Sequence, residues 1–141
     1  MGNWGERKSS RRGRDGRDRL PPFVALTWDL LNSQAYKKLP PSATKALPYF
    51  LGKVKVKYHD PQKYIEEFKF SYTEGRRDGF ALGTFSKVIH DLIRFGFIDP
   101  VAKAKPGRYG KGENVFKLSR RWEQYGRERF EEVEPWKKFL P

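Results

Sequence analysis

The sequence contains no cysteine, and none of its apolar runs approaches the roughly 18 to 20 residues that a membrane-spanning helix needs. Without cysteine there is no disulfide, no thiolate metal site and no cysteine nucleophile. The first residues also lack the apolar stretch of a signal peptide. We therefore expect a cytoplasmic protein with no membrane partner.

Acidic residues are also scarce in this chain. Thirty Lys and Arg stand against seventeen Asp and Glu, which gives a net charge of +13 and a pI near 10.0. Such a surplus destabilises a folded chain by self-repulsion unless a polyanion neutralises it, and nucleic acid is the most common polyanionic partner. A membrane surface would instead require a basic amphipathic helix outside the core, which the sequence does not show. We expect a nucleoid-associated protein.

The residues that usually carry catalysis are few and scattered. His59 and His90, the two histidines, belong to different predicted elements and lack metal-ligand spacing. The glycine-rich stretch "GRYGKGE" lacks the Lys-Ser/Thr ending and the following helix of a phosphate-binding P-loop. We predict that the protein is not an enzyme and has no metal, no cofactor and no small-molecule ligand.

The chain divides into an arm, a domain and an extension. Residues 1–20 are rich in Arg and Gly and hold almost no core-forming side chains, which predicts a disordered basic arm. The arm either serves only for solubility or follows a phosphate backbone or minor groove, through Arg11, Arg12, Arg14 and Arg17. The 141 residues, of which 37% are apolar, suffice for one modest core. We place one domain at 21–125 and an aromatic C-terminal extension at 126–141.

The first part of the domain has helical patterns. Thr27 and Ser33 can each cap a short helical segment, and Pro41 suits the first turn of a longer helix. Pro48 lies inside that helix and should bend it or open a hydrogen bond. The helix has the clearest helical spacing of apolar residues in the chain, at Ala43, Ala46, Leu47, Phe50, Leu51 and Val54.

A short strand, a helix and a turn follow. The residues "FKF" at 68–70 alternate as a strand does, and Ser71 with Glu74 forms a capping box for a helix over about 72–78. A glycine-containing turn then leads to a helix over about 82–95, which is the spacing of a helix-turn-helix motif. The apolar side of this second helix holds Phe85, Val88, Ile89, Leu92, Ile93 and Phe95, and its polar side holds Gly83, Ser86, Lys87, His90 and Arg94, with Asp91 at the margin.

Two strand-like runs, 97–104 and 114–119, are joined by a loop with three glycines and several cations. They predict an antiparallel hairpin with a basic tip, a wing over about 97–118. The order of helix, strand, helix, turn, helix and hairpin predicts an α+β fold of the winged helix-turn-helix kind, mostly helical with a small β-hairpin.

The stretch "LPPSATKAL … FSYTEGRRDGFALGTFSKVIHDLIRFGFIDP" resembles winged helix-turn-helix proteins of bacteria and their mobile elements, including plasmid replication initiators and transcriptional regulators. Ala81 stands where such proteins usually have a capping serine. The resemblance implies that the exposed early residues of the recognition helix read bases, and in this chain they are Leu82, Gly83, Thr84, Ser86 and Lys87.

The chemistry of these residues suits a DNA major groove, which admits one α-helix. Lys87 can reach guanine or a phosphate, the Thr84 methyl group can contact a thymine methyl group, and Ser86 can bond to either. His90 and Arg94 lie further along the helix and suit the DNA backbone. The other predicted phosphate contacts are Arg76, Arg77, Lys105, Arg108 and Lys111, while Tyr109 at the wing tip can pack on a sugar or enter a groove.

We therefore predict sequence-specific binding of double-stranded DNA, in transcription regulation or in the replication or maintenance of a mobile element. Two alternatives remain: a protein-interaction winged helix in a replication or partition complex, and RNA binding through the Arg/Gly arm. Trp122 and Tyr125 are expected to close the core beside the hairpin. The rest of the aromatic extension either packs back on the domain or forms a homodimer.

Overall fold

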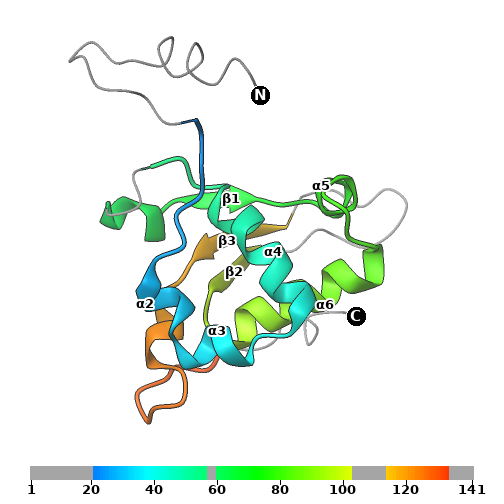
Figure 1. Cartoon of the computed structure of the whole chain (residues 1–141). Coiled ribbons are helices and arrows are strands. Elements are labelled where there is room, and N and C mark those ends of the chain that lie inside the picture. Colours follow the sequence, from blue (N-terminus) through cyan, green and yellow to red (C-terminus); the bar gives the residue numbers. More distant parts are fainter. Residues whose placement is uncertain (1–20, 57–59, 103–113, 134–141) are drawn as a thin grey trace, which may run out of the picture.

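The computed structural model describes residues 21–56, 60–102 and 114–133. Within these ranges the chain is α+β, with helices packed around a small antiparallel sheet (Figure 1). No helix in the described ranges is long and apolar enough to cross a membrane. Several sequence predictions lie outside them, namely the N-terminal arm with Arg11, Arg12, Arg14 and Arg17, His59, the wing-tip residues Lys105, Arg108, Tyr109 and Lys111, and residues 134–141.

The described part of the chain contains five α-helices, two 3-10 turns and three strands. The helices are α2 (Trp28–Leu31), α3 (Gln34–Lys38), α4 (Pro41–Leu51), α5 (Tyr72–Arg77) and α6 (Leu82–Arg94), and the 3-10 turns are η1 (Pro61–Tyr64) and η2 (Arg121–Gln124). The strands are β1 (Glu67–Lys69), β2 (Ile98–Ala102) and β3 (Val115–Leu118). In Figure 1, α5 and the start of α6 form the right-hand edge of the molecule, away from α2 and α3.

The predicted helix starts are confirmed. Thr27 and Ser33 each accept a hydrogen bond from the backbone N–H three residues later, and Pro41 is the first residue of α4. Ser71 and Glu74 form the capping box in both directions at the start of α5. These starts were predictable because a cap depends on residues within one helical turn.

The predicted helix ends need small corrections. The apolar spacing extends the first long helix to Val54, but α4 ends at Leu51 with Gly52 as its C-cap. Val54 lies in the loop after α4 and is nevertheless buried, because this loop packs on the core. Pro48 lies inside α4, and the helix continues beyond it for one more turn.

One face of the sheet packs on the hydrophobic core. Its antiparallel strands have the order β1-β3-β2, so the last strand in the chain is the central one. Phe68 of β1 pairs with Phe116 of β3, and Ile98 of β2 pairs with Leu118 of β3. All four side chains are buried, and burial alternates along β1 and β3 as in a half-buried sheet, whereas β2 becomes more exposed from Ile98 to Ala102.

The other face of the sheet carries charges. Lys117 in the central strand pairs with Glu67 on one side and with Asp99 on the other, so opposite charges lie next to each other across the strands. The register between β2 and β3 is irregular between Pro100 and Ala102, where β2 leaves the regular ladder.

The core is dominated by phenylalanine rings. The Phe50 ring of α4 lies 4.5 Å from the Phe70 ring, 5.7 Å from Phe116 and 5.9 Å from Phe85 of α6, measured between ring centroids. Burying one such side chain stabilises the fold by about 1.5 to 3 kcal/mol, and ring pairs add about 0.5 to 1.5 kcal/mol. These rings therefore join α4, the sheet and α6 into one core.

The contact between α5 and α6 is unusually close. A Cβ atom at Gly75 would lie 2.7 Å from the Phe85 ring, so only glycine fits at this point of α5. The helix then ends with Gly79 at a φ of 103°, which lets the Phe80 N–H donate back to the Gly75 carbonyl at 2.9 Å. Two glycines thus set the distance between the two helices and the direction of the turn that joins them.

Arg121 joins three parts of the fold. Its Nε donates to Asp99 Oδ1 at 2.7 Å, and Nη1 donates to the Glu131 carbonyl at 2.9 Å. Its Nη2 donates to the Ile93 carbonyl near the end of α6 at 2.8 Å and to the Ile98 carbonyl at 3.1 Å. The side chain is only 10% exposed. Arg121 therefore connects α6, β2 and the C-terminal segment.

The aromatic residues after β3 cover the core as the sequence predicts. Trp122 stacks on Phe97 with ring centroids 6.1 Å apart, and Tyr125 packs on Phe95 at 4.9 Å. Phe130 contacts the Tyr125 ring edge-on at 5.2 Å. The first part of the C-terminal extension thus packs back on the domain.

We predict that Arg121→Lys lowers the free energy of unfolding by about 1 to 3 kcal/mol, because one ammonium group cannot replace the fork of donors and leaves buried carbonyls unsatisfied. The matched control is Arg120→Lys, because Arg120 is exposed, with Glu123 as its ion-pair partner and the Tyr64 ring as a neighbour, and none of its hydrogen bonds in the described part of the chain goes to a buried carbonyl. The control should change the same quantity by less than about 0.5 kcal/mol. Urea unfolding followed by circular dichroism measures both, and equal losses would contradict the role assigned to Arg121.

Candidate nucleic-acid interface

The two faces predicted for α6 are present. Phe85, Val88, Ile89 and Leu92 are fully buried against the rest of the domain. The helix begins after Ala81, which makes no side-chain cap, as its replacement of serine leads one to expect. It ends at Arg94, one residue earlier than predicted, with Phe95 as C-cap.

The first turn of α6 is open to solvent. Leu82 is 60% exposed, which is high for a leucine, and Thr84 is also exposed. A Cβ atom at Gly83 would meet no atom within 4 Å, so packing does not require a glycine there. Lys87 is exposed one turn further on, and Ser86 is half-buried beside it. This turn offers small and apolar groups and no acidic residue.

Asp91 differs from its predicted place. The helical spacing puts it at the margin of the polar side, but it is 6% exposed and belongs to the buried side. Its Oδ1 lies 3.8 Å from His90 Nδ1. The buried arc is wider than the apolar pattern because α6 packs on α4, α5 and β2 together. The outward surface of α6 therefore carries Lys87 and Arg94 without a carboxylate between them.

Two of the predicted phosphate contacts lie at the end of α5. Arg76 and Arg77 are exposed, and cations at this end interact favourably with the helix dipole. Arg77 Nη2 lies 4.0 Å from Glu74 Oε2, at the limit of an ion pair. The turn of residues 78–81 joins these arginines to Leu82, so the fold brings them next to the first turn of α6.

His90 and Arg94, which are also predicted to contact DNA, lie further along α6 from its first turn. His90 is half-buried and Arg94 is exposed in the last turn. A rise of about 1.5 Å per residue places Arg94 about 18 Å along the helix from Leu82. These two residues can contact a long ligand at a second point but cannot share one small site with Leu82.

Sequence reasoning missed Lys45 of α4. Its Nζ lies 5.2 Å from the centre of the Phe80 ring, and a Cβ atom at Gly79 would be 3.8 Å from it. Lys45 therefore adds a third cation to the turn that already carries Arg76 and Arg77. The sequence contains only a weak signal, since Lys45 lies on the polar side of α4, and its position depends on how α4 crosses the turn.

Lys53 and Glu74 form a second contact that the sequence does not predict. The Lys53 ammonium pairs with Glu74 and lies 4.4 Å from the centre of the Phe70 ring. Burial alone would raise the pKa of Glu74, but the hydrogen bonds from Lys53 and Ser71 outweigh it and hold the pKa below its usual range. Glu74 therefore stays ionised and is occupied by partners inside the domain.

The basic residues of α5 and α6 are more exposed than the acidic ones. Over residues 72–94 the acidic residues are Glu74, Asp78 and Asp91, of which Glu74 is ion-paired and Asp91 is buried. The basic residues Arg76, Arg77, Lys87 and Arg94 are all exposed. Although the sequence of this segment is nearly neutral, its surface is cationic.

Among the described residues, no group of three or more His, Asp or Glu is arranged to hold a metal ion. Comparison of the chain with protein-family models, with curated proteins and with solved structures found no match.

We predict that Glu74→Gln destabilises the protein at neutral pH and that this difference disappears in acid. The pKa of Glu74 is lowered in the folded state from 4.5, so its ionised form stabilises the fold above pH 4.5, and that contribution is lost as the pH falls through the lowered pKa. Unfolding free energies of both proteins, measured by urea at a series of pH values, report the difference.

A double-mutant cycle with Lys53→Gln tests the cause. If Lys53 holds the pKa of Glu74 down, Glu74→Gln should lose much of its pH dependence in the Lys53→Gln background. A difference that is the same at every pH, in either background, would show that the Glu74 carboxylate is not stabilised by this pair.

Proposed function

We propose that the chain binds duplex DNA as a winged helix-turn-helix domain, with α5 and α6 as the helix-turn-helix, α6 as the recognition helix, and β2 and β3 as the base of the wing. The element order α4, β1, α5, α6, β2, β3 and the sheet order β1-β3-β2 support this assignment. So does the close packing of Gly75 on Phe85, which holds the two helices together.

The observation that carries the proposal is the surface of α6. Its first turn exposes Leu82, Gly83 and Thr84, which are small or apolar and let a helix approach base edges. Lys87 follows on the outward side, while the one carboxylate of the helix, Asp91, is turned inward. A surface helix with no binding role usually has both acidic and basic residues on its exposed face.

The surrounding cations suit the DNA backbone. Lys45, Arg76 and Arg77 gather at the turn before α6, where phosphates flank a helix in the major groove. His90 and Arg94 are further backbone contacts along the same helix. The cationic arm and the basic wing tip add charge of the same sign by sequence.

The alternatives have less support from the described residues. Typical RNA-binding sheets stack bases on aromatic side chains, but the outer face of this sheet carries Glu67, Lys69, Asp99, Val115 and Lys117. A protein-interaction role would use the same surface of α6 for an acidic partner. Transcription regulation and replication of a mobile element would both use the DNA binding proposed here.

The direct test is selection of bound duplexes from a random DNA pool, followed by affinity measurements on the recovered site. The proposal requires a recurring motif whose affinity exceeds that for unrelated duplex by about a thousandfold or more. Recovery of no motif, with dissociation constants for any duplex weaker than about 10⁻⁴ M at physiological salt, would favour the protein-interaction alternative.

On the selected site, we predict that Ser86→Ala combined with Lys87→Ala lowers the specific affinity by about 1 to 3 kcal/mol for each lost base contact, with little effect on unrelated duplex. Arg76→Ala is the matched comparison. It should weaken binding to all duplexes alike and reduce the salt slope by about 1, as loss of a phosphate contact does. Equal loss on all duplexes from the first variant would remove the base-reading role of α6.

Gly83→Ala should separate folding from binding. Because Gly83 is exposed and a Cβ atom there meets no neighbour, alanine should raise the unfolding free energy by about 1 kcal/mol through helix propensity. The added methyl group should nevertheless weaken specific DNA binding, because the backbone can no longer approach the base edges as closely.

The control for this prediction is Ser42→Ala, an exposed change in the first turn of α4. It should leave DNA affinity unchanged. If Gly83→Ala stabilises the fold and binds the selected site as well as the parent protein, the first turn of α6 does not lie against the bases.

A further inference from the structure

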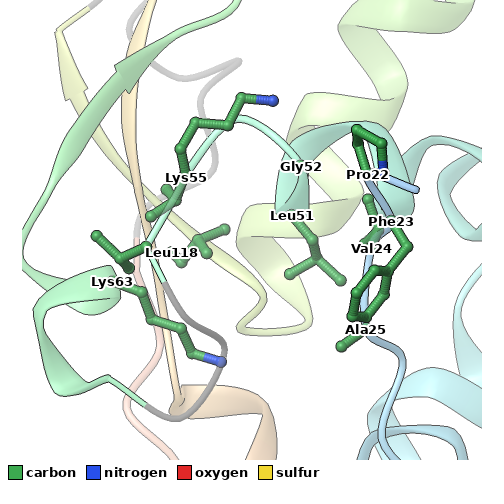
Figure 2. A pocket seen from close by; sticks show the side chains of 11 residues that line it. Pro22, Phe23, Val24, Ala25, Leu51, Gly52, Lys55, Lys63 and Leu118 are labelled. Atoms are coloured by element: carbon green, nitrogen blue, oxygen red, sulfur yellow. The ribbon is translucent and has the colours of Figure 1, made fainter. Parts of the chain in front are cut away.

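The segment 22–25 and the loop after α4 line a half-open pocket that lies outside the proposed DNA-binding surface. Its volume is about 720 Å³, which is within the range of small-molecule sites. Figure 2 shows Phe23 on one side, Lys55 and Lys63 on the other, and Leu51 and Leu118 between them. The full lining is Pro22, Phe23, Val24, Ala25, Leu51, Gly52, Val54, Lys55, Val56, Lys63 and Leu118.

The lining has a definite chemical character. Lys55 and Lys63 are its only charged residues, and the other nine are apolar or glycine. Phe23 is 68% exposed beside the cavity, so its ring has little apolar contact in the protein alone. The segment is nevertheless seated on the domain, since a Cβ atom at Gly52 would lie 3.1 Å from Val24 Cγ2.

Lys63 is placed where an anion would be favourable. Its Nζ lies 5.0 Å from the centre of the Tyr64 ring, and the Arg120 guanidinium lies 5.6 Å from the same ring. Burial and the nearby Arg120 charge lower the pKa of Lys63. Glu123 pairs with Arg120 at 3.1 Å, and no carboxylate of the described chain lies within ion-pair distance of Lys63.

We propose that this cavity binds an elongated apolar molecule with one anionic group, such as a medium-chain carboxylate. The apolar chain lies on Leu51, Leu118 and the Phe23 ring, and the anion pairs with Lys63. The sequence pattern does not predict this site, because its lining comes from four separate segments of the chain. The proposal does not depend on DNA binding, since α6 contributes nothing to the cavity.

The experiment compares two probes of equal chain length and opposite charge, decanoate and decyltrimethylammonium, by isothermal titration calorimetry below their micelle concentrations. We expect one decanoate per chain, bound at least about tenfold more tightly than the ammonium probe. Methyl resonances of Leu51, Val54 and Leu118 should shift on addition of decanoate. Equal affinity for the two probes, or no saturable binding of decanoate, would overturn the proposal.

Variants locate the site. Lys63→Gln should weaken decanoate binding about tenfold without weakening the binding of decyltrimethylammonium, whose charge Lys63 repels. Lys37→Gln is the charge-matched control, because Lys37 is exposed on α3 and does not line the cavity. Ala25→Trp should block decanoate by filling the space, with circular dichroism used to verify the fold. If Lys63→Gln and Lys37→Gln weaken binding equally, the anion is attracted by net charge and not by this cavity.

Discussion

The contact of the Phe85 ring with the backbone of α5 at Gly75 determines how the helices of this domain are arranged. A side chain at position 75 would have to displace the ring, and the ring is held by Phe50, Phe70 and Phe80 at centroid distances of 5.0 to 5.9 Å. Because core aromatics are close-packed, small shifts of Phe85 would be felt throughout the core. The orientation of α6, and with it the exposed first turn, is therefore a consequence of core packing.

The opposite end of α6 is held by different chemistry. Gly96 has a φ of 90°, and the Phe97 N–H donates to the Leu92 carbonyl at 2.9 Å, so the chain turns directly from the helix into β2. Arg121 Nη2 then donates a hydrogen bond to the Ile93 carbonyl. A helix fixed by packing at its start and by hydrogen bonds at its end is a rigid support, and surface side chains on rigid elements are positioned more accurately than those on loops.

The parts that the sequence predicts well are those decided within a few residues. The capping box of Ser71 and Glu74 and the order of helices and strands depend on local chemistry and on the period of the apolar residues, and both agree with the structure. Asp91 lies on the buried side of α6 because three elements pack around this helix, and helical spacing alone cannot reveal that. Likewise, Lys45 lies at the turn because α4 crosses it there. Arg120 and Arg121 are adjacent and have the same side chain, so the sequence does not indicate which of them the fold buries.

The irregular strand β2 has a consequence for assembly. Open strand edges can pair with a strand of another molecule, and proteins commonly prevent this with proline, irregular register, charged side chains and short strands. Here Pro100 offers no N–H donor and is followed by the break in register, while β1 at the other side of the sheet is three residues long with charged side chains at both ends. Both edges of the described sheet are therefore poorly suited to pairing with a strand of a second molecule.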